Sequence, residues 1–216
     1  MRHRLTALTA ALALLLPLQV AAESTAGSAA AADTAPAEAA PKGPLELTRS
    51  AADRVLGEIR NNRAKYESDT AALITLVDGL VDQLFDFQTM SLLVLGPHWK
   101  SASEEQRSRF VEGFKNLLIK TYSKALLQAG DEPIQWEPLD LAPGDTRTIV
   151  NAKAQTSAGP IAISWRLRQT GDSWRVYDVV VDGISLVTNY RGSYSAEIRK
   201  VGLDGLIQKL EQHAAG

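Results

Sequence analysis

The chain has 216 residues, a formal net charge of −2 at pH 7 and no cysteine. A chain of this length can bury a substantial core in one domain, and the lack of cysteine excludes disulfides, thiol catalysis and cysteine-rich zinc sites. The small negative charge disfavours nucleic acid and anionic membranes as general binding partners.

The first 22 residues have the three parts of a signal peptide. Two arginines precede a short apolar run at residues 5–18, and small residues offer a cleavage site near Ala22. The apolar run is shorter than the roughly 20 residues that a membrane span needs, and an uncleaved anchor is the alternative. We therefore expect an exported protein that acts in the periplasm after cleavage.

Residues 23–44 are rich in alanine and proline and hold almost no large apolar side chain. Such a segment cannot bury enough surface to offset the entropy that it loses on ordering. We expect it to be a disordered leader, followed by a folded domain over residues 45–213.

From Leu45 onward, apolar residues recur at helical spacing. Four-residue steps predict a first helix from Leu45, and a second apolar stripe predicts another helix after Asp69. A third, short helix is expected to stop at Gly96-Pro97. Proline lacks the backbone N–H and disfavours the helical conformation for the residue before it, so it ends the helix there.

The stretch SEEQ at residues 103–106 has the pattern of a capping box, in which serine and glutamine side chains bond to each other's backbone N–H groups. It predicts the start of a long helix that buries Phe110 and Phe114 on one side. His98 and Trp99 then lie at a corner between two helices rather than at the end of a catalytic strand.

In the second half of the chain, the apolar period changes from about 3.6 to 2. Four alternating segments predict antiparallel strands at residues 134–141, 146–156, 161–169 and 173–181, separated by turns that contain glycine. Two more helices are expected at residues 185–200 and 203–212. These elements predict an α+β fold in which a curved, four-stranded antiparallel sheet and the flanking helices enclose a cavity.

The sequence offers little catalytic chemistry. His98 is the one histidine outside the signal peptide and the C-terminal end, and a zinc site needs three or four ligands. Motifs of metalloproteases, α/β-hydrolases and nucleotide-binding loops are missing from the sequence. We expect no catalytic residue, no metal and no cofactor. Asp178, inside an apolar strand, either faces solvent or pairs with Arg166 on the neighbouring strand.

Two blocks of the sequence carry motifs in a fixed order. Residues 93–126 contain a Leu-Gly corner, a tryptophan, Ser-x-x-Gln-Arg and a helix that ends in Tyr-x-x-Ala-Leu. Residues 173–210 contain Trp-x-x-Tyr-Asp, Gly-Ile-Ser-Leu and Gly-Leu-Asp-Gly-Leu. In both blocks the chain resembles the MlaC family, also called the toluene-tolerance auxiliary family, and the resemblance covers roughly residues 45–210.

The resemblance implies a function and a set of partners. MlaC-like proteins carry phospholipid through the periplasm between outer- and inner-membrane complexes and maintain outer-membrane lipid asymmetry. They hold acyl chains in the cavity of an NTF2-like sheet. The implied partners are an inner-membrane ABC transporter with an MCE-type subunit and an outer-membrane lipoprotein–porin complex. Alternatives are a hopanoid or other terpenoid cargo, or an NTF2-like enzyme that acts on a hydrophobic substrate.

A lipid carrier must cover nearly all of the acyl surface, because each exposed CH₂ group costs about 0.8 kcal/mol. Periodicity alone leaves open whether the apolar stripes form a filled core or line a pocket. The candidate lining residues are Phe110, Phe114, Leu117, Ile149, Ile163, Trp165, Val179, Val181, Ile184 and Leu186. The candidates for the pocket mouth, or for braces between sheet and helices, are Arg107, Arg166, Tyr177, Asp178 and Arg191.

Overall fold

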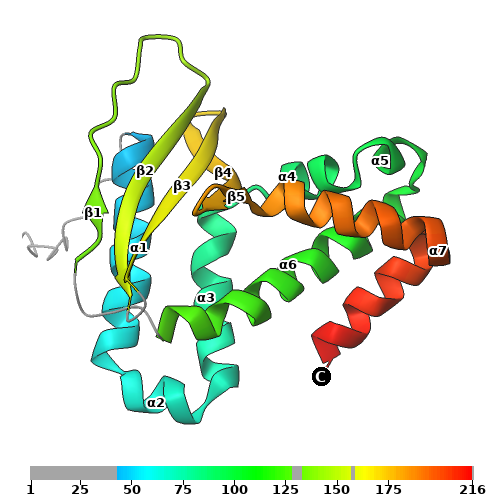
Figure 1. Cartoon of the computed structure of the whole chain (residues 1–216), viewed down its shortest axis with the longest axis horizontal. Coiled ribbons are helices and arrows are strands. Elements are labelled where there is room, and N and C mark those ends of the chain that lie inside the picture. Colours follow the sequence, from blue (N-terminus) through cyan, green and yellow to red (C-terminus); the bar gives the residue numbers. More distant parts are fainter. Residues whose placement is uncertain (1–42, 128–132, 157–158, 216) are drawn as a thin grey trace, which may run out of the picture. The chain divides into compact units, whose positions relative to one another are not determined.

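Helices occupy both ends of the described chain and antiparallel strands lie between them in sequence (Figure 1). The computed structural model describes residues 43–127, 133–156 and 159–215, so the predicted signal peptide and most of the predicted leader lie outside the described residues. The helices are α1 (Pro44–Asn61), α2 (Arg63–Ser68), α3 (Thr70–Leu84), α4 (Phe87–Leu95), α5 (Pro97–Ser101), α6 (Glu104–Leu127) and α7 (Leu186–Ala215).

The strands form one antiparallel sheet in chain order, which confirms the predicted meander. They are β1 (Gln135–Trp136), β2 (Arg147–Thr156), β3 (Gly159–Thr170), β4 (Ser173–Val181) and β5 (Ile184–Ser185). The sheet has five strands rather than the four expected. The additional strand is β5, and β1 is only two residues long, although the Glu137 N–H beyond it still donates to the Asn151 carbonyl at 3.0 Å.

The register gives β2, β3 and β4 two chemically different faces. Cross-strand partners share a face, and neighbouring residues of one strand point to opposite faces. We call one side the apolar face; it carries Val150, Ala152, Ile161, Ile163, Trp165, Leu167, Val176, Val179 and Val181. We call the other the charged face; it carries Arg147, Ile149, Lys153, Arg166, Arg168, Arg175 and Asp178. The register shifts between Arg166 and Leu167, where Tyr177 is the extra residue of a bulge.

Three clusters of buried side chains make up the core. On the apolar face, Leu167 and Val176 are fully buried and pack in one cluster with Leu47 of α1. A second cluster joins α1, α2, α3 and α6 around Leu73. The third lies between α4, α6 and α7 and is centred on Phe110. The sheet therefore packs against α1 and α3 through the first cluster, while β4 and β5 also contact α4 and α7, which share the third cluster with α6.

Side-chain caps fix the helix starts that the sequence predicted. The capping box is confirmed, because the Gln106 N–H donates to Ser103 Oγ at 3.1 Å and the Ser103 N–H donates to Gln106 Oε1 at 3.0 Å. Asp69 caps α3 by accepting a hydrogen bond from the Ala72 N–H at 2.9 Å. After α4, Gly96 has φ 54°, which suits glycine, and Pro97 opens the short helix α5 where only a break was expected.

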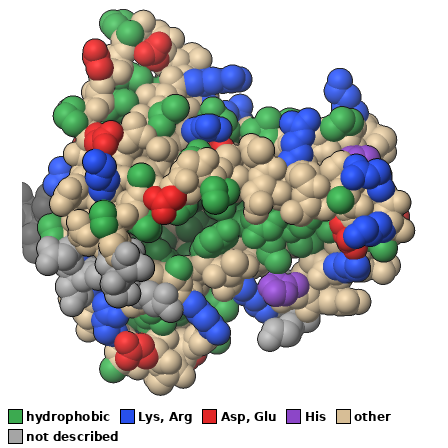
Figure 2. Space-filling view, in the orientation of Figure 1, with side chains coloured by type: hydrophobic (Ala, Val, Ile, Leu, Met, Phe, Trp, Pro, Cys, Tyr) green, Lys and Arg blue, Asp and Glu red, His purple; other side chains and the backbone are tan. Residues whose placement is uncertain are grey.

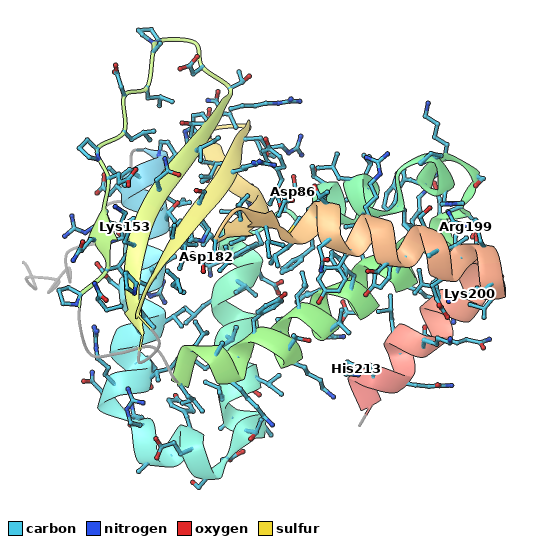
Figure 3. All side chains as sticks on the ribbon, viewed as in Figure 1. Asp86, Lys153, Asp182, Arg199, Lys200 and His213 are labelled. Carbon is cyan, nitrogen blue, oxygen red and sulfur yellow. The ribbon has the colours of Figure 1, made fainter. Side chains whose placement is uncertain are left out.

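The last helix, α7, bends at Gly202, whose φ of 75° and ψ of 173° are not helical. The bend divides α7 into a first arm, residues 186–201, and a second arm, residues 203–215. These two arms correspond to the two helices predicted at residues 185–200 and 203–212. The second arm lies close against α6: a Cβ added to Gly113 would lie 2.9 Å from Leu210 Cβ. Arg199 and Lys200 lie at the bend, far from the sheet (Figure 3).

Candidate functional site

Hydrophobic side chains gather in a hollow between the strands, α6 and α7 (Figure 2). We call this feature the apolar hollow. The partly or largely exposed apolar side chains of these elements include Ile163, Val181 and Ile184 from the sheet, Leu117 and Tyr122 from α6, and Leu186 and Tyr190 from the first arm of α7. Large exposed apolar surface of this kind marks a binding site in a soluble protein more often than a chance feature.

The apolar face is covered at one end and open at the other. One row of cross-strand partners runs from Ala152 through Ile163 and Val181 to Ile184. Along this row the exposed fraction rises from 2% at Ala152 to 63% at Ile184. Two rows away, Leu167 and its partner Val176 are fully buried. The same face therefore supplies both a filled core and an open apolar surface.

The predicted lining residues separate into three groups. Five of them, Ile163, Trp165, Val179, Val181 and Ile184, share the apolar face with one another, as expected. Leu117 and Leu186 are partly buried on the helices that border the hollow.

The other three predicted lining residues lie elsewhere. Phe110 and Phe114 are fully buried between α6 and α7, with ring centroids 5.8 Å apart, so they belong to the filled core. Ile149 is 47% exposed on the charged face, opposite Arg166. The ten residues therefore do not form one continuous surface, because Ile149 points to the other side of the sheet.

Asp178 is a structural junction at the charged face. Its carboxylate is buried, at 2% exposure, and accepts hydrogen bonds from Arg166 Nη1 at 3.0 Å and Ser185 Oγ at 2.7 Å. Its second oxygen accepts from the Val187 N–H at 3.1 Å. The predicted pair with Arg166 is thus present. Asp178 joins β3, β4, β5 and the start of α7, and its side chain belongs to the charged face rather than to the apolar face.

Arg107 and Arg191 make bracing contacts at the helix corner. Arg107 Nε donates to the Trp99 carbonyl at 3.0 Å, and its guanidinium lies 5.4 Å from the centroid of the Trp99 ring. The guanidinium of Arg191 packs so closely on Gly96 that a Cβ there would lie 3.1 Å from Arg191 Nη2. The sequence analysis allowed two roles for these arginines, at the pocket mouth or as braces between sheet and helices. The contacts described here are those of braces.

Tyr177 also occupies a packed position. It is the bulge residue of β4, is partly buried and packs against the cluster between α4, α6 and α7. It therefore links the sheet to the helices through side-chain packing, which is the bracing alternative of the sequence prediction.

Sequence reasoning did not single out the tyrosines at the α6–α7 contact. Tyr190 and Tyr194 have ring centroids 5.4 Å apart, and Tyr190 forms a side-chain hydrogen bond with Tyr122. Burial and then the neighbouring tyrosine hydroxyls raise the pKa of Tyr190 and of Tyr194 well above the ordinary tyrosine value. The four-residue spacing of Tyr190 and Tyr194 was visible in the sequence, but their contact with α6 depends on tertiary packing.

The described residues offer little for metal chemistry or for a membrane span. Within them, no three acidic or histidine side chains are grouped so as to bind a metal ion. His213 lies near the end of the second arm of α7, far from the sheet (Figure 3). Of the helices that the structure describes, none combines the length and apolarity that crossing a bilayer requires.

Comparison with known proteins identifies the family. The family model described as MlaC protein matches residues 49–212. The chain belongs to the MlaC family. Among MlaC relatives, the intermembrane phospholipid transport system binding protein MlaC of Haemophilus influenzae is 31% identical over 177 residues, which are 80% of this chain and 82% of that protein.

Two further relatives support the same assignment. The toluene tolerance protein ttg2D of Pseudomonas putida is 25% identical over 163 residues, covering 74% of this chain and 75% of that protein. A solved phospholipid-binding protein of Ralstonia solanacearum, in complex with a phospholipid, has a TM-score of 0.73 and 28% identity. That match covers 79% of this chain and 96% of the solved chain, so the whole MlaC-type fold is shared.

Proposed function

We propose that this chain is a periplasmic phospholipid carrier that holds acyl chains in the apolar hollow. The observation that carries the proposal is a correspondence: a relative with the same fold was solved with a phospholipid bound. In this chain the Ile163–Val181–Ile184 end of the apolar face is only partly covered, with Ile184 largely exposed. The family is one of lipid-binding transport proteins, and the hollow gives this member a surface for the same work.

The physical chemistry of the cargo agrees with this surface. A 16-carbon chain moved into water costs about 12 kcal/mol, at about 0.8 kcal/mol for each CH₂ group. A carrier lowers that cost by covering the chain with apolar side chains while the polar head group stays in water. The open end of the apolar face provides such side chains next to solvent, where a lipid can enter.

The fixed role of Asp178 favours a carrier over an enzyme. An NTF2-like enzyme needs an acid or base that reaches its cavity. Both carboxylate oxygens of Asp178 instead accept hydrogen bonds at the charged face, from Arg166, Ser185 and the Val187 N–H. Asp178 is therefore assigned to holding the sheet against α7 rather than to catalysis.

We also propose the route and the partners. Residues 1–22 direct export and are cleaved, and the predicted leader, which ends where α1 begins at Pro44, precedes the lipid-binding domain. The protein then receives and delivers lipid at an inner-membrane ABC transporter with an MCE-type subunit and at an outer-membrane lipoprotein–porin complex. The sequence contains no nucleotide-binding motif, so the energy for directional transport comes from such a partner.

Native mass spectrometry of the mature protein, purified from a periplasm without detergent, tests the proposal. We expect a bound mass equal to a phospholipid, identified after organic extraction. A bound mass of hopanoid size would support the carrier function but show that the cargo is a hopanoid rather than a phospholipid. A bare protein that also takes up no lipid from vesicles would contradict the proposed function.

A further inference from the structure

Three tyrosines lie together on α6 and the first arm of α7, the two helices that border the apolar hollow. We call Tyr122, Tyr190 and Tyr194 the tyrosine cluster. The Tyr190 and Tyr194 rings are 5.4 Å apart, and Tyr190 is hydrogen-bonded to Tyr122. Phe114 holds both α7 tyrosines edge-on, at 5.2 Å from Tyr190 and 6.0 Å from Tyr194. The cluster is thus fixed by aromatic packing between the two helices.

The cluster extends from the surface into the protein. Tyr122 is 38% exposed, Tyr190 is partly buried and Tyr194 is 9% exposed. Burial raises the pKa of Tyr190 and of Tyr194, and the nearby hydroxyl of Tyr122 adds a smaller increase to both. The hydroxyls of Tyr190 and Tyr194 therefore stay neutral near pH 7 and can donate hydrogen bonds.

Tyr194 ends this series with an unsatisfied group. Its hydroxyl is buried and has no hydrogen-bond partner among the described residues. Buried polar groups almost always have a partner, and each exception needs an explanation. Tyr66 shows the ordinary situation, because its hydroxyl donates to Glu58 Oε1 at 3.0 Å. The unpaired Tyr194 hydroxyl points to an acceptor that arrives with a ligand.

The surroundings restrict the chemistry of that acceptor. Phe110 and Phe114 pack edge-on against Tyr194, which makes its environment apolar. A buried phosphate would need a compensating cation, whereas burial and neighbouring tyrosines are what shift the pKa of Tyr194 in the described part of the chain. An ester carbonyl fits better, because it is neutral, only accepts hydrogen bonds and is attached directly to an acyl chain.

We propose that the tyrosine cluster anchors the cargo by a hydrogen bond from the Tyr194 hydroxyl to an ester carbonyl of a bound glycerolipid. This inference rests on the proposed function and names the part of the lipid that is recognised. Tyr190 and Tyr122 continue the cluster from Tyr194 to the protein surface. A cargo without an ester, such as an ether lipid, lacks this carbonyl acceptor and binds less tightly.

A competition between ester and ether lipids tests this anchor. The mature protein is incubated with vesicles that contain equal amounts of diacyl and dialkyl phosphatidylglycerol of the same chain length, then re-isolated, and its lipid is quantified by mass spectrometry. We expect the wild-type protein to take up the ester lipid in roughly tenfold excess, the size of effect that one hydrogen bond in an apolar site produces.

Two phenylalanine variants locate the source of the preference. Tyr194→Phe should bring the ester-to-ether ratio close to one, with ether-lipid uptake and the melting temperature preserved, because only an unpaired hydroxyl is removed. Tyr66→Phe is the matched control: its hydroxyl belongs to the Glu58 contact in another cluster, so the preference should persist. If Tyr194→Phe does not fold, Tyr190→Phe replaces it and should reduce the ratio at least threefold.

The outcomes separate this inference from the proposed function. If the wild-type protein takes up neither lipid, the carrier function itself fails. Equal uptake of both lipids by the wild-type protein would overturn the ester anchor while the carrier stands. A full ester preference in Tyr194→Phe, or in Tyr190→Phe where that variant takes its place, would also overturn the anchor.

Discussion

On the apolar face Trp165 and Val179 lie opposite each other, whereas one residue further along β3 the charged face pairs Arg166 with Asp178. The two faces belong to the same strands, so strand propensity and hydrogen bonding are shared between them. They differ in what covers them. Helices α1 and α3 cover only part of the apolar face, whereas the charged face carries the ion pairs Arg166–Asp178 and Arg168–Asp86, whose arginines are partly exposed to solvent. The difference separates two tasks, with cargo contact on one face and fastening of the fold on the other.

The fastening contacts of the charged face link distant elements. Arg168 Nη2 lies 2.6 Å from Asp86 Oδ2, which connects β3 to the start of α4. Arg175 Nη1 donates to the Asp82 carbonyl at 2.7 Å and so connects β4 to the end of α3. These contacts hold the helices in place around the sheet. An apolar face can then remain open at one end without loss of the fold.

The largest expected effect is on the fastening side, at Asp178. Replacing Asp178 by alanine removes the carboxylate that accepts three hydrogen bonds. The donors Arg166, Ser185 and the Val187 N–H then lose this acceptor. We expect urea unfolding to show a loss of about 3 kcal/mol in the free energy of unfolding. Asp172→Ala, in the exposed β3–β4 turn, is the control and should change stability by less than about 0.5 kcal/mol. A near-neutral Asp178→Ala would contradict the junction.

Two separate aspartate variants, one on each face, test the difference between the apolar and charged faces most clearly. Ile184 is 63% exposed beside the apolar hollow, and Ile149 is 47% exposed on the charged face. A charge at Ile184 would have to be desolvated against an acyl chain, so Ile184→Asp should reduce phospholipid uptake from vesicles about tenfold. Ile149→Asp should leave uptake unchanged, because it lies on the other side of the sheet.

Both variants should fold, since each side chain already meets water, and circular dichroism melting checks this. Equal losses of uptake in the two variants would remove the distinction between the faces. Normal uptake by Ile184→Asp would place the cargo elsewhere in the molecule.

Acid should weaken the charged face through Asp86. Burial alone would raise its pKa, but hydrogen bonds from the backbone and hydroxyl of Thr89 and the contact with Arg168 outweigh burial and lower it. A lowered folded-state pKa means that ionised Asp86 stabilises the protein above the unfolded value of about 4, and that this contribution is lost as the pH falls below it.

Asp86→Asn isolates this contribution while it keeps a side chain that can cap α4. We expect the variant to be less stable than the wild-type protein by about 1–2 kcal/mol at pH 7, with the gap closing as the pH falls below about 4. Urea unfolding at a series of pH values measures the gap. Asp69→Asn, at the exposed cap of α3, is the control. A gap that stays constant into acid would show that charge is not the cause.

The smallest effect concerns a row of like charges. Arg147 lies opposite Arg168, and Arg168 lies opposite Arg175, so three arginines occupy one row of the charged face. Like charges in direct opposition destabilise a sheet, and Arg147→Gln should therefore stabilise the protein by up to about 0.5 kcal/mol at low salt. The gain should vanish near 1 M salt, where the Debye length is about 3 Å. A salt-independent change would indicate packing rather than charge.

The sequence predicted the α+β class, the meander and most helix boundaries, because those depend on local periodicity and capping. It placed five strand residues together correctly on β3, β4 and β5, where alternation is strict. The sequence could not assign Ile149 to a face of the sheet. Ile149 and Val150 are adjacent and both apolar, so the alternation of residues does not show which of them faces the core. The strand predicted at residues 134–141 is also longer than β1, which covers only Gln135–Trp136.

The division between core and pocket was beyond the sequence. Phe110 and Phe114 share one helical stripe with Leu117, but the fold buries the two phenylalanines and leaves Leu117 partly exposed. The cause is the packing of α7, whose second arm closes over Gly113. The tyrosine cluster was missed for the same reason, because it exists only where α6 meets the first arm of α7.

The central claim is that acyl chains lie against the open end of the apolar face, and photo-cross-linking tests it most directly. The mature protein is loaded with a phospholipid that carries a diazirine on one acyl chain, irradiated, digested and mapped by mass spectrometry. The account predicts cross-links to the β4–β5 segment around Val181 and Ile184 and to the hollow-facing part of α6 or α7. Cross-links concentrated around Ile149 on β2, with none at Val181 or Ile184, would contradict it.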